Sequence, residues 1–173
     1  MHVLLTSHHA PPHIGGVENL VLAEAKALLA AGHRVTWITS DSQGAGQEPP
    51  PHERFELVRV PALHWPERWF GIAYPLFAPS LLWRTWRAVA AADVVHVHGL
   101  VFPASPLACL FARLAGKWSV CTDHGGLLQY RWSVGTMFLR LLFATVGRIT
   151  ARCADRLVAY NREVEALQQR LCG

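Results

Sequence analysis

Short runs of apolar residues alternate along the chain with longer stretches in which apolar residues recur every three or four positions. The short runs are typical of buried strands, and the periodic stretches are typical of helices that bury one face. This alternation predicts strands at 3–6, 35–39, 55–60, 94–99, 119–122 and 157–160. It predicts helices at 17–29, 81–92, 104–115, 136–154 and 163–171, with irregular connections at 42–53 and 62–79.

The regular succession of strands and helices predicts an α/β fold, with a Rossmann-like open parallel sheet and helices on both faces. The strands are apolar almost throughout, which fits parallel strands that are covered on both sides. The chain has 173 residues, of which 51% are hydrophobic, so we expect one domain spanning residues 1–173. Ligands of such sheets bind beyond the carboxyl ends of the strands, which points to loops 7–16, 98–103 and 123–130.

The composition excludes several classes of protein. Only 16% of the residues are charged, so the chain is too apolar to be disordered. The net charge is +4, but Lys and Arg are scattered, and we predict no nucleic-acid partner. The amino terminus does not resemble a signal peptide, and no apolar stretch is long enough to span a membrane. The cysteines lack CxxC spacing and predict buried free thiols in a reducing, cytoplasmic compartment; they are Cys109, Cys121, Cys153 and Cys172.

The first loop carries two adjacent glycines, Gly15 and Gly16, at the expected start of a helix. Backbone amides at a helix start bind anions, and glycine lets a phosphate approach closely, so the loop is a candidate phosphate contact. The alternative is a tight turn that needs a positive φ angle. A nicotinamide cofactor is not favoured, because the GxGxxG pattern is absent even though Asp41 stands where a ribose-binding acid would lie.

Histidines follow two of the predicted strands. His96 and His98 are two positions apart and therefore share one face of a strand, with His98 nearer its carboxyl end. His124 follows the next strand, beside a glycine pair that leaves room for a ligand. Because parallel strands end at one edge of the sheet, we expect His98 and His124 to border the same crevice as Gly16.

A metal site is the alternative interpretation of these histidines. His8, His9 and His13 could join His98 and His124 in one cluster. No HExxH or Cys/His pair occurs, however, and acidic ligands near these positions are few, so we predict no metal. A GxSxG nucleophile motif and a carboxylate pair for glycoside hydrolysis are also missing.

Five short motifs follow one another along the chain. They are Pro11-Pro12-x-x-Gly15-Gly16-Val17-Glu18, Ala31-Gly32-His33-x-Val35, Asp93-Val94-Val95-His96-Val97-His98, Thr122-Asp123-His124-Gly125 and Ala154-Asp155-Arg156. Together they resemble the N-terminal domain of the retaining glycosyltransferases of family 4, which have the GT-B fold. The resemblance covers essentially the whole chain and identifies it as one half of such a fold.

The resemblance implies two Rossmann-like domains that face each other across a cleft. The N-terminal domain mostly holds a saccharide or lipid-linked acceptor, and the C-terminal domain holds most of the nucleoside-diphosphate sugar. That C-terminal domain is absent from this chain, so we expect the isolated domain to be inactive or nearly so. The whole enzyme would transfer a sugar with retention of anomeric configuration. It would need no cofactor or divalent metal, because amides, a helix dipole and cations stabilise the leaving diphosphate.

The resemblance also implies roles for particular residues. The amide of Gly16 would face the donor diphosphate, and Gly15 would give the turn its conformation. His124 would bond the transferred sugar near the reaction centre, and His98 would line the cleft on the acceptor side. Further residues of the motifs are expected to line the cleft: Glu18, Asp123 and Gly125. The chain departs from the family pattern at Tyr160-Asn161 and at Asp123.

Three other hypotheses remain open at this stage. The same fold could serve as a non-catalytic, acceptor-docking subunit of a split glycosyltransferase, or as a GT-B nucleotide-sugar epimerase. The aromatic segment 65–86, with Arg140, Arg148 and Arg152 on a later helix, could also contact an anionic membrane at the inner face. The alternative for that segment is a core-packed loop and helix.

Overall fold

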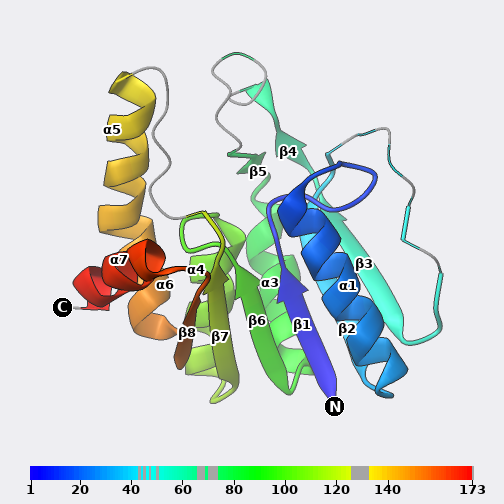
Figure 1. The fold of residues 1–173 in the computed structure, drawn as a ribbon. Coiled ribbons are helices and arrows are strands. Elements are labelled where there is room, and N and C mark those ends of the chain that lie inside the picture. Colours follow the sequence, from blue (N-terminus) through cyan, green and yellow to red (C-terminus); the bar gives the residue numbers. More distant parts are fainter. Residues whose placement is uncertain are drawn as a thin grey trace.

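The computed structural model describes residues 1–42, 44, 46, 48–49, 51–65, 69, 74–125 and 133–172. The centre of the fold is a six-stranded parallel sheet with the strand order β3-β2-β1-β6-β7-β8 (Figure 1). Its strands are β1 (His2–Thr6), β2 (Arg34–Ser40), β3 (Phe55–Val60), β6 (Val94–His98), β7 (Trp118–Asp123) and β8 (Arg156–Ala159). The predicted parallel α/β fold is confirmed, and each predicted strand end lies within one residue of the observed one.

Helices connect most successive strands, as the alternating pattern predicts, whereas β2 and β3 are joined by the predicted irregular connection. They are α1 (Gly16–Ala30), α3 (Ser80–Ala91), α4 (Ala104–Leu114), α5 (Ser133–Leu142), α6 (Arg148–Cys153) and α7 (Arg162–Cys172). The helix predicted at 136–154 is divided, because the π-helical segment η1 (Phe143–Gly147) joins α5 to α6. Such a widened turn leaves no trace in the hydrophobic period from which the helix was predicted.

The two faces of the sheet bury separate apolar clusters because side chains alternate along each strand. Leu5 and Trp37 point to the face covered by α1, where they pack with Val21 and Ala25 of that helix. Leu4 and its counterparts in the neighbouring strands point to the other face, which is covered by α3, α4, α6 and α7. Figure 1 shows α1 in front of the sheet, with α3 and α4 behind it.

One local prediction is wrong, and one alternative is excluded. The connection predicted at 62–79 contains a small antiparallel sheet of β4 (Ala62–Leu63) and β5 (Leu76–Phe77), whose two-residue strands are too short to show a period. The positive φ angle considered for Gly15 is also absent, since Gly15 has the extended values φ −163° and ψ 168°. Positive φ angles occur instead at Gly32, Gly99 and Gly116, where α1, β6 and α4 end.

All four cysteines are free. Cys109 and Cys121 are buried, which confirms the prediction for these two, whereas Cys172 is exposed because it lies in the last turn of α7. Among the described helices, none is both long and apolar enough to cross a bilayer.

Candidate functional site

The predicted meeting of His98 and His124 is confirmed. β6 ends at His98, and β7 ends at Asp123, directly before His124. The two strands are neighbours in register, so the residues that end them lie at one edge of the sheet. His98 Nδ1 is 3.0 Å from His124 Nε2, and the two rings are stacked with their centroids 5.3 Å apart.

The loop before α1 reaches the same edge. The ring of His8 stacks on Phe102, which follows β6, with centroids 4.0 Å apart. Burial, together with the proximity of His13 and His124, lowers the pKa of His8 to about 3, so His8 is neutral at pH 7. Glu18, in the first turn of α1, lies 3.7 Å from His8 (Oε1 to Nε2). The start of α1 and the imidazole beyond β7 therefore border one region of the molecule.

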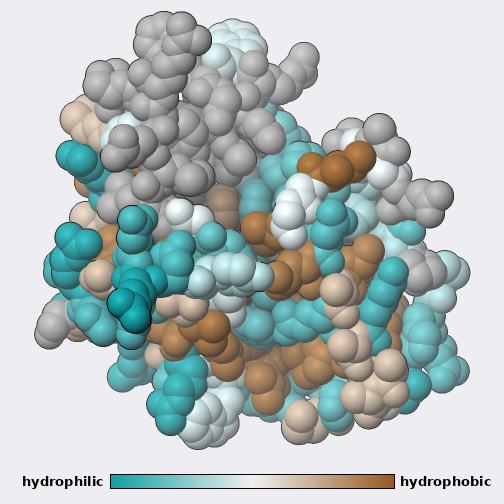
Figure 2. All heavy atoms as spheres, in the orientation of Figure 1, coloured by the Kyte–Doolittle hydropathy of each residue, from teal (hydrophilic) through white to brown (hydrophobic). Residues whose placement is uncertain are grey.

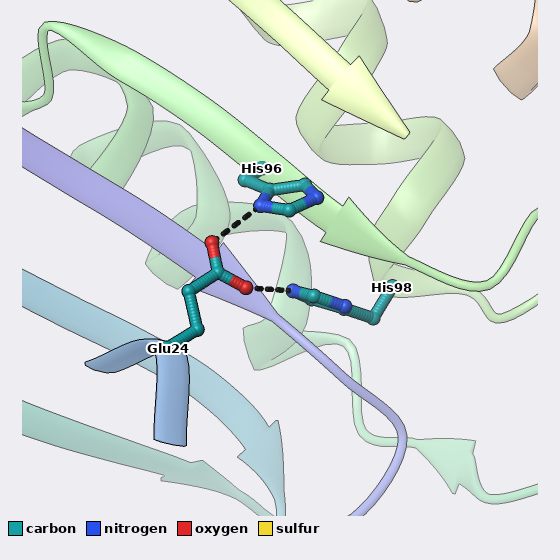
Figure 3. Close-up of side chains that lie close together, drawn as sticks. All are labelled: Glu24, His96 and His98. Carbon is teal, nitrogen blue, oxygen red and sulfur yellow. Dashed lines mark hydrogen bonds and ion pairs between the residues drawn. The ribbon is translucent and has the colours of Figure 1, made fainter. Parts of the chain in front are cut away.

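A carboxylate that the sequence analysis missed lies beneath this edge. Glu24 of α1 points across β1 toward β6 (Figure 3). Its Oε1 is 2.6 Å from His96 Nδ1, and its Oε2 is 3.1 Å from His98 Nε2. The one signal in the sequence is that Glu24 comes three positions after the buried Val21, which places it at the edge of the apolar face of α1.

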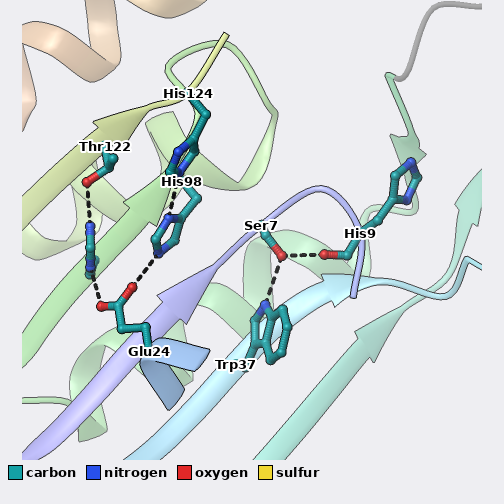
Figure 4. Close-up of polar contacts among 8 residues, drawn as sticks. Ser7, His9, Glu24, Trp37, His98, Thr122 and His124 are labelled. Carbon is teal, nitrogen blue, oxygen red and sulfur yellow. Dashed lines mark hydrogen bonds and ion pairs between the residues drawn. The ribbon is translucent and has the colours of Figure 1, made fainter. Parts of the chain in front are cut away.

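The hydrogen bonds continue on both sides of Glu24. His96 Nε2 lies 2.8 Å from the Thr122 hydroxyl, and His98 bonds His124, so one polar network joins α1, β6 and the end of β7 (Figure 4). The side chain of His98 is fully buried, and those of His96 and Glu24 are mostly buried. A buried network of this kind holds its members in fixed orientations because each unmade bond would cost free energy.

The pKa values indicate which members of the network are charged. Burial alone would raise the pKa of Glu24, but hydrogen bonds from His96 and His98 outweigh it, and the pKa falls to about 2. Burial lowers the pKa of His98, against the opposing hydrogen bond to Glu24. Burial, followed by the nearness of His98 and His96, lowers the pKa of His124 to about 4. At neutral pH, Glu24 is therefore ionised, and His98 and His124 are neutral.

The two glycines of the first loop differ in their surroundings. A Cβ atom at Gly15 would collide with the carboxylate of Glu18, which is itself buried and lies 3.3 Å from His13. A Cβ atom at Gly16 would meet nothing within 4 Å, so the space in front of the first helical residue is open. Of the two predicted phosphate contacts, Gly16 has the more accessible surroundings.

The histidines form two groups rather than one metal cluster. In the first, His9 stacks on His13 with ring centroids 4.3 Å apart, and it lies 4.7 Å from His8 and 5.6 Å from His64. In the second, the nitrogen and oxygen atoms of Glu24 and its two partners could hold a metal ion. However, each carboxylate oxygen already faces one imidazole, Oε1 in a hydrogen bond with His96 Nδ1 and Oε2 at an ion-pair distance from His98 Nε2.

The remaining predicted residues surround the end of β7. Asp123 is buried, whereas Gly125 is exposed and lines a cavity of about 460 Å³ in front of α7. Asn161 lines it too, and its side chain accepts a bond from Val164 N at the start of that helix. Tyr160 lies 5.5 Å from His124, between ring centroids. Residues 126–130 of the predicted loop are outside the described part of the chain.

A second, larger cavity lies at the opposite edge of the sheet. It has a volume of about 620 Å³ and lies between the beginnings of β1 and β2 and the helix α3, lined among others by His2, Arg34, Arg84 and Arg87. Asp41, the alternative ribose-binding acid, bonds Ala62 N and His64 instead, so it serves to hold the start of β4. The cavity therefore lies away from the histidines at the carboxyl ends of the strands, whereas Asp41, directly after β2, lies at the same edge of the sheet as they do.

Known proteins resemble this chain in sequence and in fold. The GDP-mannose:cellobiosyl-diphosphopolyprenol alpha-mannosyltransferases of Xanthomonas oryzae and Xanthomonas campestris are 31% and 30% identical to it over 92% of its length. The chain spans only 39% of the length of these relatives. Among solved structures, Anabaena HepE in complex with UDP-glucose matches all of the chain, and the chain covers 41% of HepE, with a TM-score of 0.65 and 15% identity.

More distant structures share the fold. MurG of Acinetobacter baumannii and the UDP-GlcNAc 2-epimerase of Methanocaldococcus jannaschii both match with a TM-score of 0.51, at 18% and 13% identity, over 91% and 98% of this chain. The chain covers about two fifths of each, so the fold is one Rossmann-like half of a GT-B architecture. The sequence profile of Glycosyltransferase Family 4 matches residues 14–173, and the chain belongs to that family.

Proposed function

We propose that the whole protein transfers a sugar from a nucleoside-diphosphate sugar to an acceptor, with retention of anomeric configuration. In this proposal the present domain holds the acceptor and part of the donor diphosphate. The observation that carries it is the placement of the open amide end of α1 and of His124 at one edge of the sheet. Membership of Glycosyltransferase Family 4 supports the class of reaction.

The geometry suits the charges that such a transfer develops. The leaving diphosphate gains negative charge, which the amides and dipole at the start of α1 stabilise. The sugar gains positive charge, which a neutral His124 does not repel. His124 would accept a hydrogen bond from a sugar hydroxyl, and the buried His98 would hold the His124 ring through their 3.0 Å contact.

The names of the relatives suggest the substrates. The Xanthomonas proteins use GDP-mannose and a diphosphopolyprenol-linked acceptor, and HepE binds UDP-glucose. We therefore propose a hexose donor of this type and a saccharide linked to a polyprenyl diphosphate as acceptor. The remaining donor contacts would come from a C-terminal domain, and residues 1–173 alone would transfer sugar at a negligible rate.

The test measures sugar transfer by the intact protein with GDP-mannose and UDP-glucose as donors. We expect His124→Ala to lower kcat/KM by about a hundredfold, since a contact to the reacting sugar is worth about 2–3 kcal/mol. The control is His52→Ala, because His52 is an exposed histidine in another part of the chain. Unchanged transfer by His124→Ala would remove this residue from the site. Donor binding without transfer would indicate an acceptor-docking subunit, and an epimerised donor would indicate an epimerase.

A lipid-linked acceptor requires contact with a membrane, and the helical layer behind the sheet suits one. The helices α3, α4, α5 and α6 contain no Asp or Glu, and they carry Arg84, Arg87, Arg113, Arg140, Arg148 and Arg152. They also expose large apolar side chains, including Leu82, Trp83, Trp86, Leu114 and Leu141. Trp86 of α3 packs edge-on against Phe111 of α4, and Arg113 of α4 bonds the Arg152 carbonyl of α6, so these contacts join α3, α4 and α6 into one layer.

This layer would bind the inner face of the membrane peripherally, because arginines attract anionic lipid and tryptophans favour the interface. Co-sedimentation with phosphatidylglycerol vesicles at low salt tests it. Trp83→Ser/Trp86→Ser should bind several-fold more weakly, and Trp118→Ser, an exposed tryptophan of β7, should bind as the wild type does. Equal binding to neutral vesicles would show that attraction between the arginines and anionic lipid does not contribute to binding. Within the predicted aromatic segment, residues 66–68 and 70–73 are outside the described part of the chain.

A further inference from the structure

Glu24 has no part in the function proposed so far, yet it is the carboxylate on which the histidine network converges. It lies on α1, and its side chain reaches across β1 to contact two histidines of β6 (Figure 3). A largely buried charge is costly unless it is well paired, and both oxygens of Glu24 are engaged. The arrangement therefore constrains the protons on every group bonded to it.

The direction of each hydrogen bond follows from the carboxylate. His98 Nε2 lies 3.1 Å from Glu24 Oε2, which is an ion-pair distance. An ionised carboxylate has no proton to give and repels the lone pair of an unprotonated nitrogen, so the proton of His98 belongs on Nε2. A neutral imidazole has one donor and one acceptor, so His98 Nδ1 must be the acceptor. Since His98 Nδ1 faces His124 Nε2 at 3.0 Å, His124 must donate from Nε2. The second nitrogen of His124, Nδ1, is then left without a proton.

We propose that Glu24 is a positioning residue that acts through His98 to hold His124 in the tautomer with its proton on Nε2, so that Nδ1 is presented as a hydrogen-bond acceptor. The part of this proposal that concerns the sugar rests on the proposed function. The part that concerns the tautomer does not, because it follows from the contacts of Glu24, His98 and His124 alone.

The chemical consequence is selectivity for a donor group on the ligand. A bare Nδ1 accepts a hydrogen bond from a hydroxyl and cannot donate one, so His124 would bind a sugar hydroxyl through its hydrogen. The opposite order would place a proton on His98 Nδ1. His98 would then need a second proton on Nε2 to keep its contact with Glu24. Without that proton, Glu24 Oε2 would be buried without a donor, which costs free energy.

The first measurement uses the 173-residue chain with ¹⁵N-labelled histidine. Long-range ¹H–¹⁵N spectra at pH 7 distinguish protonated from unprotonated ring nitrogens without any activity assay. We expect a protonated Nε2 and an unprotonated Nδ1 for His124, and the same for His98. A protonated Nδ1 on His124 in the wild-type chain would overturn the proposal, whatever any variant does.

The second measurement replaces the carboxylate by an amide of the same shape. Glu24→Gln can donate to His98 Nε2 as well as accept from it, so His98 and His124 should become mixtures of both tautomers. The matched control is Glu165→Gln on the exposed face of α7, which should leave the spectrum unchanged. Glu24→Asp, which keeps the charge on a shorter side chain, should retain most of the wild-type tautomer. A single wild-type tautomer in Glu24→Gln would show that Glu24 does not set it.

The third measurement tests whether the tautomer of His124 affects sugar transfer by the intact protein. Glu24→Gln should lower kcat/KM about tenfold, and Glu24→Asp should recover part of that loss. Unchanged transfer by Glu24→Gln, together with loss of transfer in His124→Ala, would overturn the positioning role and leave the proposed function standing. Unchanged transfer in His124→Ala would instead refute the role of His124, while the spectra still decide the tautomer.

A bound metal is the competing explanation for the trio of Glu24, His96 and His98. Titration of the ¹⁵N-histidine-labelled chain with Zn²⁺ distinguishes a metal site from a network of hydrogen bonds. Coordination would shift the resonances of His96 Nδ1 and His98 Nε2 at stoichiometric Zn²⁺, and it would overturn the proposal because Glu24 would then act as a ligand. Retention of the spectrum in excess Zn²⁺ supports the hydrogen-bonded network.

Discussion

Acidification should lower the free energy of unfolding of this domain, because several of its histidines cannot accept a proton in the folded state. The largest effect is expected for His9. Its side chain has no exposed surface, and its Nδ1 lies 3.0 Å from the Ser40 hydroxyl. Burial, followed by the nearness of His8, His13 and His64, lowers the pKa of His9 from 6.5 to about 2. The folded protein thus keeps His9 neutral at any pH at which it would be studied.

The sign of the effect follows from proton binding. The unfolded chain takes up a proton on His9 below pH 6.5, whereas the folded chain does so only near pH 2. Protonation therefore favours the unfolded state, and the stability that is full above pH 6.5 is lost as the pH falls from 6.5 toward 2. One such proton changes the free energy of unfolding by about 1.4 kcal/mol per pH unit, so His9 should cost about 2 kcal/mol between pH 7 and pH 5.

Urea unfolding at pH 7 and at pH 5 measures this difference. His9→Asn keeps a polar atom near the position of Nδ1 but cannot titrate, so it should be less stable than the wild type at pH 7 and lose about 2 kcal/mol less on acidification. His52→Gln removes an exposed histidine and should lose as much stability as the wild type. An equal loss in His9→Asn and wild type would refute the reasoning, since it would mean that His9 binds its proton in the folded protein.

Three further predictions rest on single contacts. Gly99→Ala should destabilise the domain by about 1–3 kcal/mol in urea unfolding, because φ is +93° there and the added Cβ would collide with the Phe102 ring. Trp37→Phe should cost about 1–3 kcal/mol in the same assay, because it removes the indole N–H bond to Ser7 and leaves a cavity (Figure 4). A thiol reagent should label Cys172 in the folded protein, but should reach Cys109, whose pKa burial raises to about 12, only after unfolding; labelling of both at one rate would contradict this burial.

The edge strand β8 is covered on only one of its two faces, which no local sequence pattern predicts. Figure 2 shows hydrophobic residues at the surface on the side of the sheet that α1 covers in part. Val158 belongs to the edge strand β8, and it is 44% exposed. The run 157–160 is apolar enough to predict a strand covered on both faces, yet β8 packs mainly through Leu157, on the side of α6 and α7. Whether both faces of an edge strand are covered depends on which helices reach it, and that is decided by the tertiary structure.

The amino-acid sequence by itself determined the order and type of the main elements, because burial imposes a period of two on strands and of 3.6 on helices. It also placed His98 and His124 together, since parallel strands end at one edge. Only the tertiary structure decided that Glu24, more than 70 positions before His96 and on another element, contacts both His96 and His98. The same holds for Gly15, whose missing side chain makes room for the Glu18 carboxylate rather than for a positive φ angle. Both are through-space relations between side chains, and no spacing along a chain specifies them.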